Sequence, residues 1–239
     1  MTFGSLFAGI GGMDLGLERA GMTCKWQVEI NEYARRVLSK HWPDVRRHDD
    51  VRNFTPTDPS EWEVDVICGG FPCINISSSG KKDGIHGEHS GLWQQFSRIV
   101  RDLRPKFVVV ENVRDLVHRG LGDVLGDLAR LGFDAEWHVL PAAAFGSPQR
   151  RERMFVVAHA HGIGCEGGAK RNSQGAFSKG RLDYDGLALA ERRARDARSW
   201  VCRANDGLSN RVDRLRGLGN AVVPQVAEWI GRRIMEAAS

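Results

Sequence analysis

The chain has 239 residues, 41% hydrophobic and 27% charged, with a formal net charge of +4 and an isoelectric point near 8.9. This is the balance of a globular protein long enough to bury a core without disulfides or a structural metal, and its mild basicity permits nucleic-acid binding without requiring it. No stretch approaches the roughly 20 apolar residues of a membrane span. The five cysteines form no regular framework, which indicates reduced thiols in a cytoplasmic setting, and the start of the chain lacks the basic region of a signal peptide.

Apolar runs of strand length alternate with segments of helical period along most of the chain. We expect strands at 4–9, 24–29, 64–68, 106–112, 134–141 and 153–160, and helices at 12–21, 31–42, 90–104, 121–132 and 220–237. Asn31 stands where a helix N-cap is expected, and the run KFVVVEN has the composition of a central parallel strand. This alternation predicts a doubly wound α/β domain with a mostly parallel sheet and ligands at the carboxyl ends of its strands.

The alternation stops near His159. Residues 159–213 are rich in Gly, Ser, Arg and Asp and hold ten Lys/Arg against seven Asp/Glu, so most of the net charge lies there. We interpret this span as a small irregular insertion over the main domain of residues 1–158, with a disordered linker as the alternative. The final segment, 214–239, is then a helix that returns to the main domain.

A glycine-rich turn, FAGIGG from Phe7 to Gly12, joins the first strand to the first helix. Glycines there allow the backbone to approach a ligand, and Glu29, at the end of the second strand, stands where nucleoside sites place a ribose-binding acid. A solvated loop acid is the alternative. The chain has no GxxxxGK[ST] motif, and its G-x-G-G spacing differs from the dinucleotide fingerprint. These features favour a phosphate-free nucleoside such as S-adenosylmethionine.

Two residues at the ends of central strands are candidates for chemistry. Cys73 follows Pro72 in GGFPCINISSSG and is either a displayed nucleophile or a small side chain in a loop, whereas Cys68, inside the apolar strand, suits an inert core thiol. Glu111 ends the run VVVEN, where partial burial would raise its pKa and let it donate a proton at neutral pH. A helix-cap neighbour or a buried salt bridge is the alternative for Glu111.

Two further clusters carry charge or metal-binding side chains. In QRRER, strand alternation places Gln149, Arg151 and Arg153 on one side, where they could hold an anion or a carbonyl oxygen; a solvated charge cluster is the alternative. The segment HAHGIGC, from His159 to Cys165, lacks the second pair of ligands that a zinc site needs. We therefore predict no metal site.

Taken in order, these segments resemble the motifs of the DNA (cytosine-5)-methyltransferase family, over residues 3–158 and roughly 211–236. The matching segments are FAGIGGMDLGLERAG, Glu29, DDV (49–51), GGFPCINISSSG, ENV (111–113), QRRER and GNAVVPQVAEWIG. The resemblance implies a Rossmann-like, S-adenosylmethionine-dependent methyltransferase fold and duplex DNA as partner. It also implies a catalytic domain at 1–158 and a target-recognition region at 159–213.

The resemblance assigns roles residue by residue. It implies cofactor binding by Phe7, Ala8, Gly9, Ile10, Gly11, Glu29, Ile30, Asp50, Val51, Pro72, Leu92, Asn220, Ala221 and Val222. It implies DNA contacts by Ser77, Lys81, Lys82 and Gln149. It implies catalysis by Cys73, Glu111, Arg151 and Arg153.

In the implied mechanism the Cys73 thiolate adds to C6 of a flipped-out cytosine, and C5 then takes the methyl group. Glu111 holds N3 and the exocyclic amine, Arg153 holds the O2 side, and Arg151 supports Glu111 or a phosphate. Flipping is needed because C6 is hidden in the stacked duplex. We expect a monomer, and the sequence leaves open a cognate restriction enzyme or a recognition partner.

The chain departs from the family pattern in three places. Ile74 and Ile76 replace the usual Gln and Phe beside the Pro-Cys pair, the long motif before the last one is not recognisable, and the recognition region is short, as in compact phage and prophage forms. Methylation of tRNA cytosine by the same fold, a non-catalytic DNA-binding relative and a small-molecule methyltransferase are the alternatives.

Overall fold

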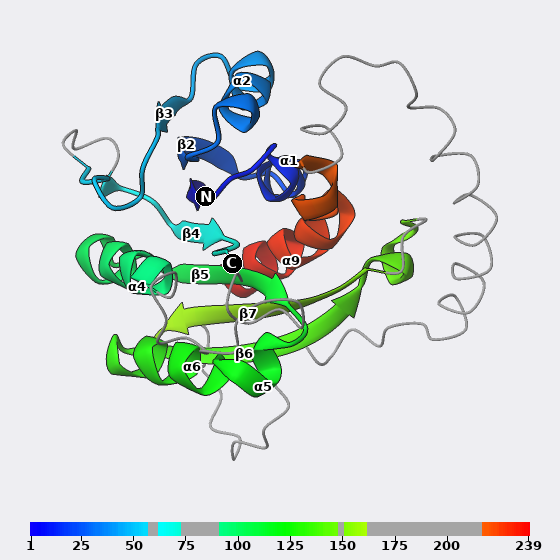
Figure 1. Ribbon diagram of the computed structural model, residues 1–239. Helices are drawn as coiled ribbons and strands as arrows, with labels where there is room; N and C mark the ends of the chain where they lie inside the picture. The colour runs from blue at the N-terminus through cyan, green and yellow to red at the C-terminus, as the bar shows by residue number, and fades with distance from the viewer. Residues whose placement is uncertain (57–61, 73–90, 148–150, 162–216) are drawn as a thin grey trace.

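The computed structural model describes residues 1–56, 62–72, 91–147, 151–161 and 217–239 (Figure 1). Of the predicted insertion at 159–213, only residues 159–161 fall within these ranges, so its order and its role stay predictions. All statements about structure below concern the described residues.

These residues form one seven-stranded sheet with the order β3-β2-β1-β4-β5-β7-β6. Its strands are β1 (Thr2–Leu6), β2 (Thr23–Val28), β3 (Arg46–His48), β4 (Val66–Gly69), β5 (Phe107–Val113), β6 (Phe133–Pro141) and β7 (Glu152–Ala160). The pairings from β3 to β5 are parallel, whereas β7 runs antiparallel to both β5 and β6. The mostly parallel α/β sheet predicted from the sequence is therefore confirmed.

Helices cover both faces of this sheet (Figure 1). They are α1 (Gly12–Arg19), α2 (Glu32–His41), α4 (Gly91–Leu103), α5 (Leu116–Arg119), α6 (Leu121–Arg130) and α9 (Pro224–Ala237), with a short 3-10 helix, η2 (Ala142–Phe145). Helices α4 and α6 lie on one face, and α1 and α9 on the other. None of the helices in the described ranges is long and apolar enough to cross a membrane.

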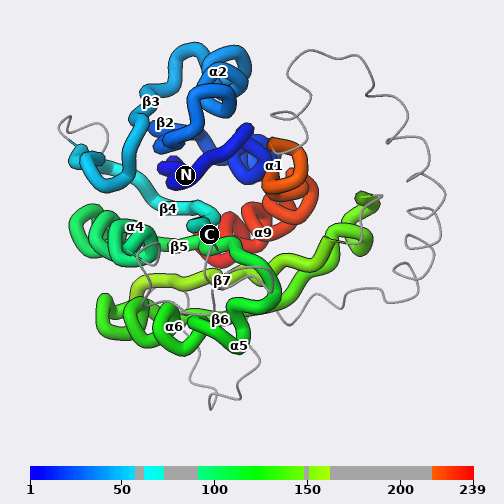
Figure 2. The backbone as a smooth tube through the Cα atoms, in the orientation of Figure 1, coloured from blue at the N-terminus to red at the C-terminus, as the bar shows by residue number. Residues whose placement is uncertain are grey.

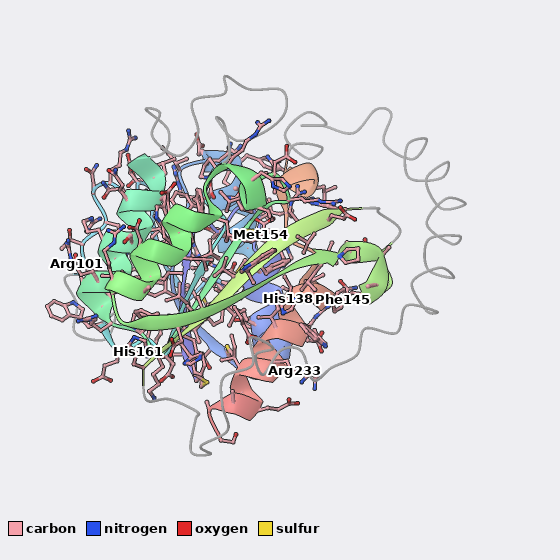
Figure 3. All side chains as sticks on the ribbon, turned by 90° about the horizontal axis from the view of Figure 1, so that it is seen from below. Arg101, His138, Phe145, Met154, His161 and Arg233 are labelled. Atoms are coloured by element: carbon pink, nitrogen blue, oxygen red, sulfur yellow. The ribbon has the colours of Figure 1, made fainter. Side chains whose placement is uncertain are left out.

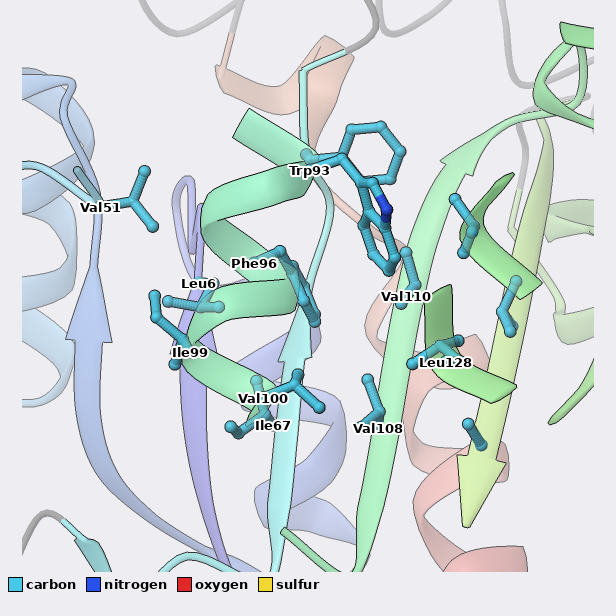
Figure 4. Close-up of a cluster of buried hydrophobic side chains, with 14 of the residues drawn as sticks. Leu6, Val51, Ile67, Trp93, Phe96, Ile99, Val100, Val108, Val110 and Leu128 are labelled. Carbon is cyan, nitrogen blue, oxygen red and sulfur yellow. The ribbon is translucent and has the colours of Figure 1, made fainter. Parts of the chain in front are cut away.

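Each face of the sheet has its own apolar core, because successive side chains of a strand point to opposite sides. In β5, Val108 and Val110 pack under α4 and α6, whereas Phe107 and Val109 face α1 and α9. Figure 4 shows the first core, where Trp93 and Phe96 of α4 lie over the sheet with their rings stacked 5.4 Å apart. A strand buried on both faces needs the continuous β-branched run that β5 has.

The first and last helices of the chain pack against each other at close range. Figure 2 shows α9, at the red end of the chain, beside α1, at the blue end. Gly12 and Gly16 of α1 make this possible, since a β-carbon on either would collide with the backbone of the final segment, and Gly231 of α9 faces Ala20. The returning C-terminal helix predicted from the sequence is therefore present from Pro224 onward.

Aromatic and cationic side chains extend this packing towards η2. The rings of Phe145 and Trp229 lie edge to face, 5.8 Å apart, and the guanidinium of Arg233 lies 5.3 Å from the Trp229 ring. Figure 3 labels Phe145 of η2 and Arg233 of α9, together with Met154 of β7.

The structure also differs from the sequence prediction. Three short elements, β3, α5 and η2, were not predicted, because three or four residues are too few to establish a period. Strand β7 continues to Ala160 and pairs with Phe133, so the domain boundary placed at 158 falls inside a strand. Asn31, by contrast, caps α2 as expected: its side chain accepts a hydrogen bond from the Ala34 amide at 3.0 Å.

Candidate active site

A cavity of about 840 Å³ opens at the carboxyl ends of β1, β2, β4 and β5. This volume lies within the range of pockets that enclose small organic ligands. Its wall includes thirteen of the fourteen predicted cofactor residues, namely Phe7, Ala8, Gly9, Ile10, Glu29, Ile30, Asp50, Val51, Pro72, Leu92, Asn220, Ala221 and Val222. The carboxyl-end location is the one that the alternation of strands and helices predicted.

The glycine loop forms one wall with an unusual backbone. Phe7, Gly9 and Gly11 all have positive φ angles, 54°, 57° and 85°, and the loop is closed by a hydrogen bond from the Gly11 amide to the Ala8 carbonyl. Gly11 is the one predicted cofactor residue that is not on the wall. It is the N-cap of α1, and a β-carbon there would meet the ring of Trp42. Its glycine is therefore explained by the turn and by this contact.

Glu29 ties the glycine loop to the turn after β2. Its carboxylate accepts hydrogen bonds from the amides of Gly9 and Asn31, each at 2.7 Å. Arg35 secures the same turn by donating to the carbonyls of Glu29 and Ile30, at 2.9 and 2.7 Å. Glu29 is thus a fixed acid on the cavity wall and not a freely solvated one. Beside it, Ile30 leaves 64% of its surface exposed at the cavity.

The segment after β3 forms the adjoining wall. Asp50 accepts hydrogen bonds from the Arg52 side chain at 2.7 Å and from its amide at 2.9 Å, which hold the Asp50 pKa below its ordinary value. Val51 is buried, and Arg98 of α4 donates to the carbonyls of Val51 and Phe54. This segment therefore has a fixed backbone beside the cavity.

At the other end of the cavity, Glu111 of β5 is only 8% exposed, and Arg153 of β7 pairs with it, Nε to Oε1, at 2.9 Å. Burial raises the Glu111 pKa, although the charges of Arg153 and Arg151 oppose the shift. The expected raised pKa is confirmed, and so is the alternative that this carboxylate is in a buried salt bridge. Gly70 leaves the space for it, since a β-carbon there would overlap Glu111 Oε2.

Arg151 lies at the same end but makes a different bond. Its Nη1 donates to the Leu218 carbonyl at 3.2 Å, and its pKa is lowered to about 10, mainly by burial and then by the charge of Arg153. Arg151 and Arg153 line one small cavity behind the main one, so the alternation of side chains is confirmed for this pair. They are not a solvated charge cluster.

The predicted nucleophile, Cys73, lies outside the described residues, as do Ser77, Lys81, Lys82 and Gln149. The residues that flank the segment 73–90, Pro72 and Gly91, both line the main cavity. Asn112 fixes the backbone two residues before Cys73, because its Nδ2 donates a hydrogen bond to the Phe71 carbonyl at 3.2 Å. The described residues on either side of the segment that contains Cys73 therefore both lie at the cavity wall.

The two thiols in the described ranges, those of Cys24 and Cys68, are poor nucleophiles. Cys68 and Cys24 are buried, and burial, followed by the charge of Asp14, raises the pKa of both. The interpretation of Cys68 as an inert core thiol is confirmed. The described ranges hold no group of three His, Cys, Asp or Glu side chains placed to bind a metal, and His161 pairs with Asp134 at 3.0 Å.

Other wall residues were not assigned individually from the sequence, although Asp49, Gly69, Gly70, Phe71, Asn112 and Val113 belong to segments that were matched there. The residues not assigned are Ser5, Leu6, Met13, Val28, Asn31, Tyr33, Ala34, Asp49, Arg52, Gly69, Gly70, Phe71, Gly91, Gln95, Asn112, Val113 and Gly217. Gln95 could have been found, because it lies one helical turn after Leu92 on α4 and so shares its face. Tyr33 had no such signal, since only the packing of α2 brings it to the cavity.

A family model described as C-5 cytosine-specific DNA methylase matches residues 1–185. The chain belongs to this family. The match contains the glycine loop, Glu29, the Pro-Cys pair, Glu111, Arg151 and Arg153, so the two ends of the cavity come from one family domain.

Curated relatives of this methylase family agree with the match. The chain is 35% identical over 157 residues to the type II methyltransferase M.NgoFVII of Neisseria gonorrhoeae, and 33% identical over 161 residues to M.HhaI of Haemophilus parahaemolyticus. The alignments cover 64% and 66% of this chain but only 42% and 48% of those proteins. The chain therefore spans less than half the length of the curated relatives it matches.

Solved structures extend the likeness in fold over more of the chain. A protein described as a DNA modification methyltransferase encoded within an E. coli prophage matches with a TM-score of 0.69 at 17% identity, covering 99% of each chain. The Entamoeba histolytica methyltransferase EhMeth matches with a TM-score of 0.66 at 15% identity, covering 100% of this chain and 97% of that one. At these identities the likeness establishes the methyltransferase fold.

Proposed function

We propose that the protein transfers a methyl group from S-adenosylmethionine to C5 of a flipped-out cytosine in duplex DNA, through a covalent bond between Cys73 and C6. The observation that carries this proposal is the single cavity that joins the two halves of the chemistry. Glu29 and the glycine loop form one end, the buried Glu111–Arg153 pair forms the other, and Pro72, which precedes Cys73, lines the same wall.

The wall of the cavity fits S-adenosylmethionine at its first end. Glu29 offers a carboxylate to ribose hydroxyls, and its bonds to the Gly9 and Asn31 amides hold it in place. Apolar side chains of Ile30 and Val51 suit the faces of a purine, and Asp50 provides an acceptor for an exocyclic amine. The cofactor supplies an electrophilic methyl group when bound.

Cys73 is the proposed nucleophile. Its thiolate forms a bond to C6 of cytosine, and the displaced electron pair makes C5 nucleophilic. C5 takes the methyl group, whose former carrier leaves as a neutral thioether. Loss of the C5 proton to a base and expulsion of the thiolate then restore the aromatic ring and the free thiol, so no oxidant or reductant is required.

Glu111 and Arg153 would act on the polar edge of the base. A carboxyl group with a raised pKa stays protonated at higher pH and can donate to N3 as electron density moves onto the ring. Arg153, which pairs with Glu111 at 2.9 Å, would meet O2 on the same edge. Addition at C6 then develops little net negative charge on the base.

Duplex DNA is the proposed substrate, with Ser77, Lys81, Lys82 and Gln149 as contacts, and the base must leave the stack to reach Glu111. We propose a monomer located in the cytoplasm at the nucleoid. The names of the relatives favour a place in a restriction–modification system.

The test is methyl transfer from labelled S-adenosylmethionine to duplex DNA, with the native protein and Cys73→Ala compared, followed by bisulfite sequencing. We expect methylation at C5 in a recurring short context and none with Cys73→Ala, while both proteins bind the cofactor equally. Label that appears only in tRNA would replace DNA by RNA as the substrate. Cofactor and DNA binding without any transfer would indicate a non-catalytic relative.

A further inference from the structure

The segment that closes the cavity from the far end of the chain is held from two sides. Gly217, Asn220, Ala221 and Val222 line the cavity and precede α9. On one side the segment packs closely against α1, since a β-carbon added to Gly12 would collide with the Val222 carbonyl. On the other side the side chain of Arg151, which immediately precedes β7, donates a hydrogen bond to the carbonyl of Leu218, 67 residues away in sequence.

Arg151 itself is anchored at its backbone and along its side chain. Its carbonyl accepts a hydrogen bond from the Ala142 amide at 2.8 Å, which fixes the residue to η2. Its Nε and Nη2 atoms are buried, and no hydrogen-bond acceptor reaches them within the described ranges. Around it lie the apolar side chains of Leu140, Phe155, Val223 and Val226. Among the described residues, the bond from Nη1 to the Leu218 carbonyl is thus the hydrogen bond that the Arg151 guanidinium makes.

Arg151 also interacts electrostatically with the charged residues Glu111 and Arg153, whose end of the cavity we call the base end. The positive charge of Arg153 opposes the charge of Arg151, and the carboxylate of Glu111 supports it. Arg151 and Arg153 are therefore two cations near one carboxylate, that of Glu111. Arg153 is the one that pairs with Glu111 directly, at 2.9 Å. The Arg151 guanidinium extends instead to Leu218, towards the end of the cavity formed by Glu29 and the glycine loop, which we call the cofactor end.

We propose that Arg151 is a positioning residue that holds the 217–222 segment against the cofactor end of the cavity, and so connects the base end to cofactor retention. This inference rests on the proposed use of S-adenosylmethionine. It differs from a role of Arg151 in contacting DNA or the base, because it predicts an effect on cofactor binding when no DNA is present.

The test compares Arg151→Met, which keeps the apolar stem and removes the donors, with Arg151→Lys, which keeps the charge. Arg114→Met is the matched control, since Arg114 is an exposed arginine at the same edge that pairs with Glu152 at 2.6 Å. Binding of S-adenosylmethionine is measured by calorimetry without DNA. Hydrogen–deuterium exchange of the peptide that contains the Ala221 amide, which bonds the Gly217 carbonyl, is followed in parallel.

We expect Arg151→Met to raise the dissociation constant about tenfold, since loss of a hydrogen bond from a charged donor costs roughly 1.5 kcal/mol. We expect Arg151→Lys to restore part of this loss. We expect exchange at 217–222 to rise in Arg151→Met and to stay native in Arg114→Met. In steady state KM for the cofactor rises, while kcat at saturation stays within a few-fold.

Native cofactor affinity and native exchange in Arg151→Met, with transfer to DNA lost, would overturn the proposal and assign Arg151 to the substrate. If Arg151→Met does not fold, Arg151→Gln decides, because its amide ends about where Nε lies and is too short to replace the Nη1 bond to Leu218: unchanged affinity and exchange there would also overturn the proposal. Failure of the native protein to bind S-adenosylmethionine is a separate result and would reject the proposed function. The exchange comparison without ligand would still report on the bond to Leu218.

Discussion

At the scale of single residues, Gly70 decides where the Glu111 carboxylate can lie. A β-carbon on Gly70 would overlap Glu111 Oε2, whereas one on Gly91, which also lines the cavity, would meet no atom of the described residues within 4 Å. The side chain of Glu111 must therefore move, or its bond with Arg153 must lengthen, if Gly70 gains a methyl group.

We predict that Gly70→Ala lowers kcat for methyl transfer by about 10²-fold or more, because a proton donor displaced from the base loses most of its effect. Cofactor affinity should change less than threefold, since the first end of the cavity is untouched. Gly91→Ala is the control and should leave kcat near native. Equal rates for the two variants would show that the Glu111 position does not limit the reaction.

A second residue-scale feature is the buried carboxyl group of Asp14, in the first turn of the helix α1 that follows the glycine loop. It accepts hydrogen bonds from Gln27 at 2.8 Å and Ser5 at 3.1 Å, and it is fully buried. Burial raises its pKa to about 6, although these two hydrogen bonds oppose the shift. The folded protein therefore binds this proton more tightly than the unfolded chain does.

A raised carboxyl pKa stabilises the fold below the unfolded value, 3.8, and this contribution is lost as pH rises through about 6. We predict that the unfolding free energy of the native protein falls by about 2 kcal/mol relative to Asp14→Asn between pH 4 and pH 7. Urea unfolding at several pH values measures the difference. Parallel pH curves for the two proteins would contradict the assignment.

At the scale of elements, the contact between α1 and α9 is the joint that brings the two ends of the chain together. Gly16 lies where a β-carbon would collide with the Ala227 side chain and the Pro224 carbonyl. Gly126 is an equally helical glycine in α6, but the nearest atom to its added β-carbon is the Arg130 guanidinium at 3.9 Å. The two positions separate packing from helix propensity.

We predict that Gly16→Ala destabilises the protein by about 1–3 kcal/mol through overpacking, and that it weakens cofactor binding because the Val222 wall moves with α9. Gly126→Ala should stabilise by roughly 0.5–1 kcal/mol, the ordinary gain of alanine over glycine in a helix. Denaturant unfolding tests both stability predictions: the midpoint should fall for Gly16→Ala and rise for Gly126→Ala, while the slope of the transition stays unchanged. Stabilisation by Gly16→Ala would mean that the helices are further apart than described.

The elements also show how far local sequence patterns reach. Long segments with a clear period, such as α4 and β5, were placed to within a residue or two, because periodicity and β-branching act within the segment itself. The antiparallel direction of β7 between β5 and β6 had no local signal. Strand direction depends on which partners are available, and the continuous apolar run of β7 fits either orientation.

At the scale of the whole molecule, the final helix belongs to the core of the main domain. Val226, Ile230 and Ile234 are each at most 3% exposed and pack with Leu17 and Phe3. Burial of three such side chains contributes roughly 5–9 kcal/mol, which is comparable to the total stability of an ordinary domain.

We therefore predict that a chain ending at residue 216 does not fold cooperatively, whereas a chain ending at 237, which lacks only the exposed Ala238 and Ser239, behaves as the native protein. Loss of a sigmoidal thermal transition by circular dichroism, with binding of a hydrophobic dye, measures the first outcome. A cooperative transition in the shorter chain would show that residues 1–216 fold without α9.

The amino-acid sequence by itself determined the fold class, the family and the chemistry-bearing residue types, because periods, glycine turns and motif order are local or linear properties. It placed Glu29 and Glu111 at one rim, since parallel strands end on the same edge of a sheet, whereas the Val222 segment was assigned to the cofactor by the family resemblance alone. Only the tertiary structure decided that Gly11 caps α1 away from the cavity and that Arg151 bonds Leu218. These outcomes depend on distances between segments far apart in sequence, which packing alone fixes.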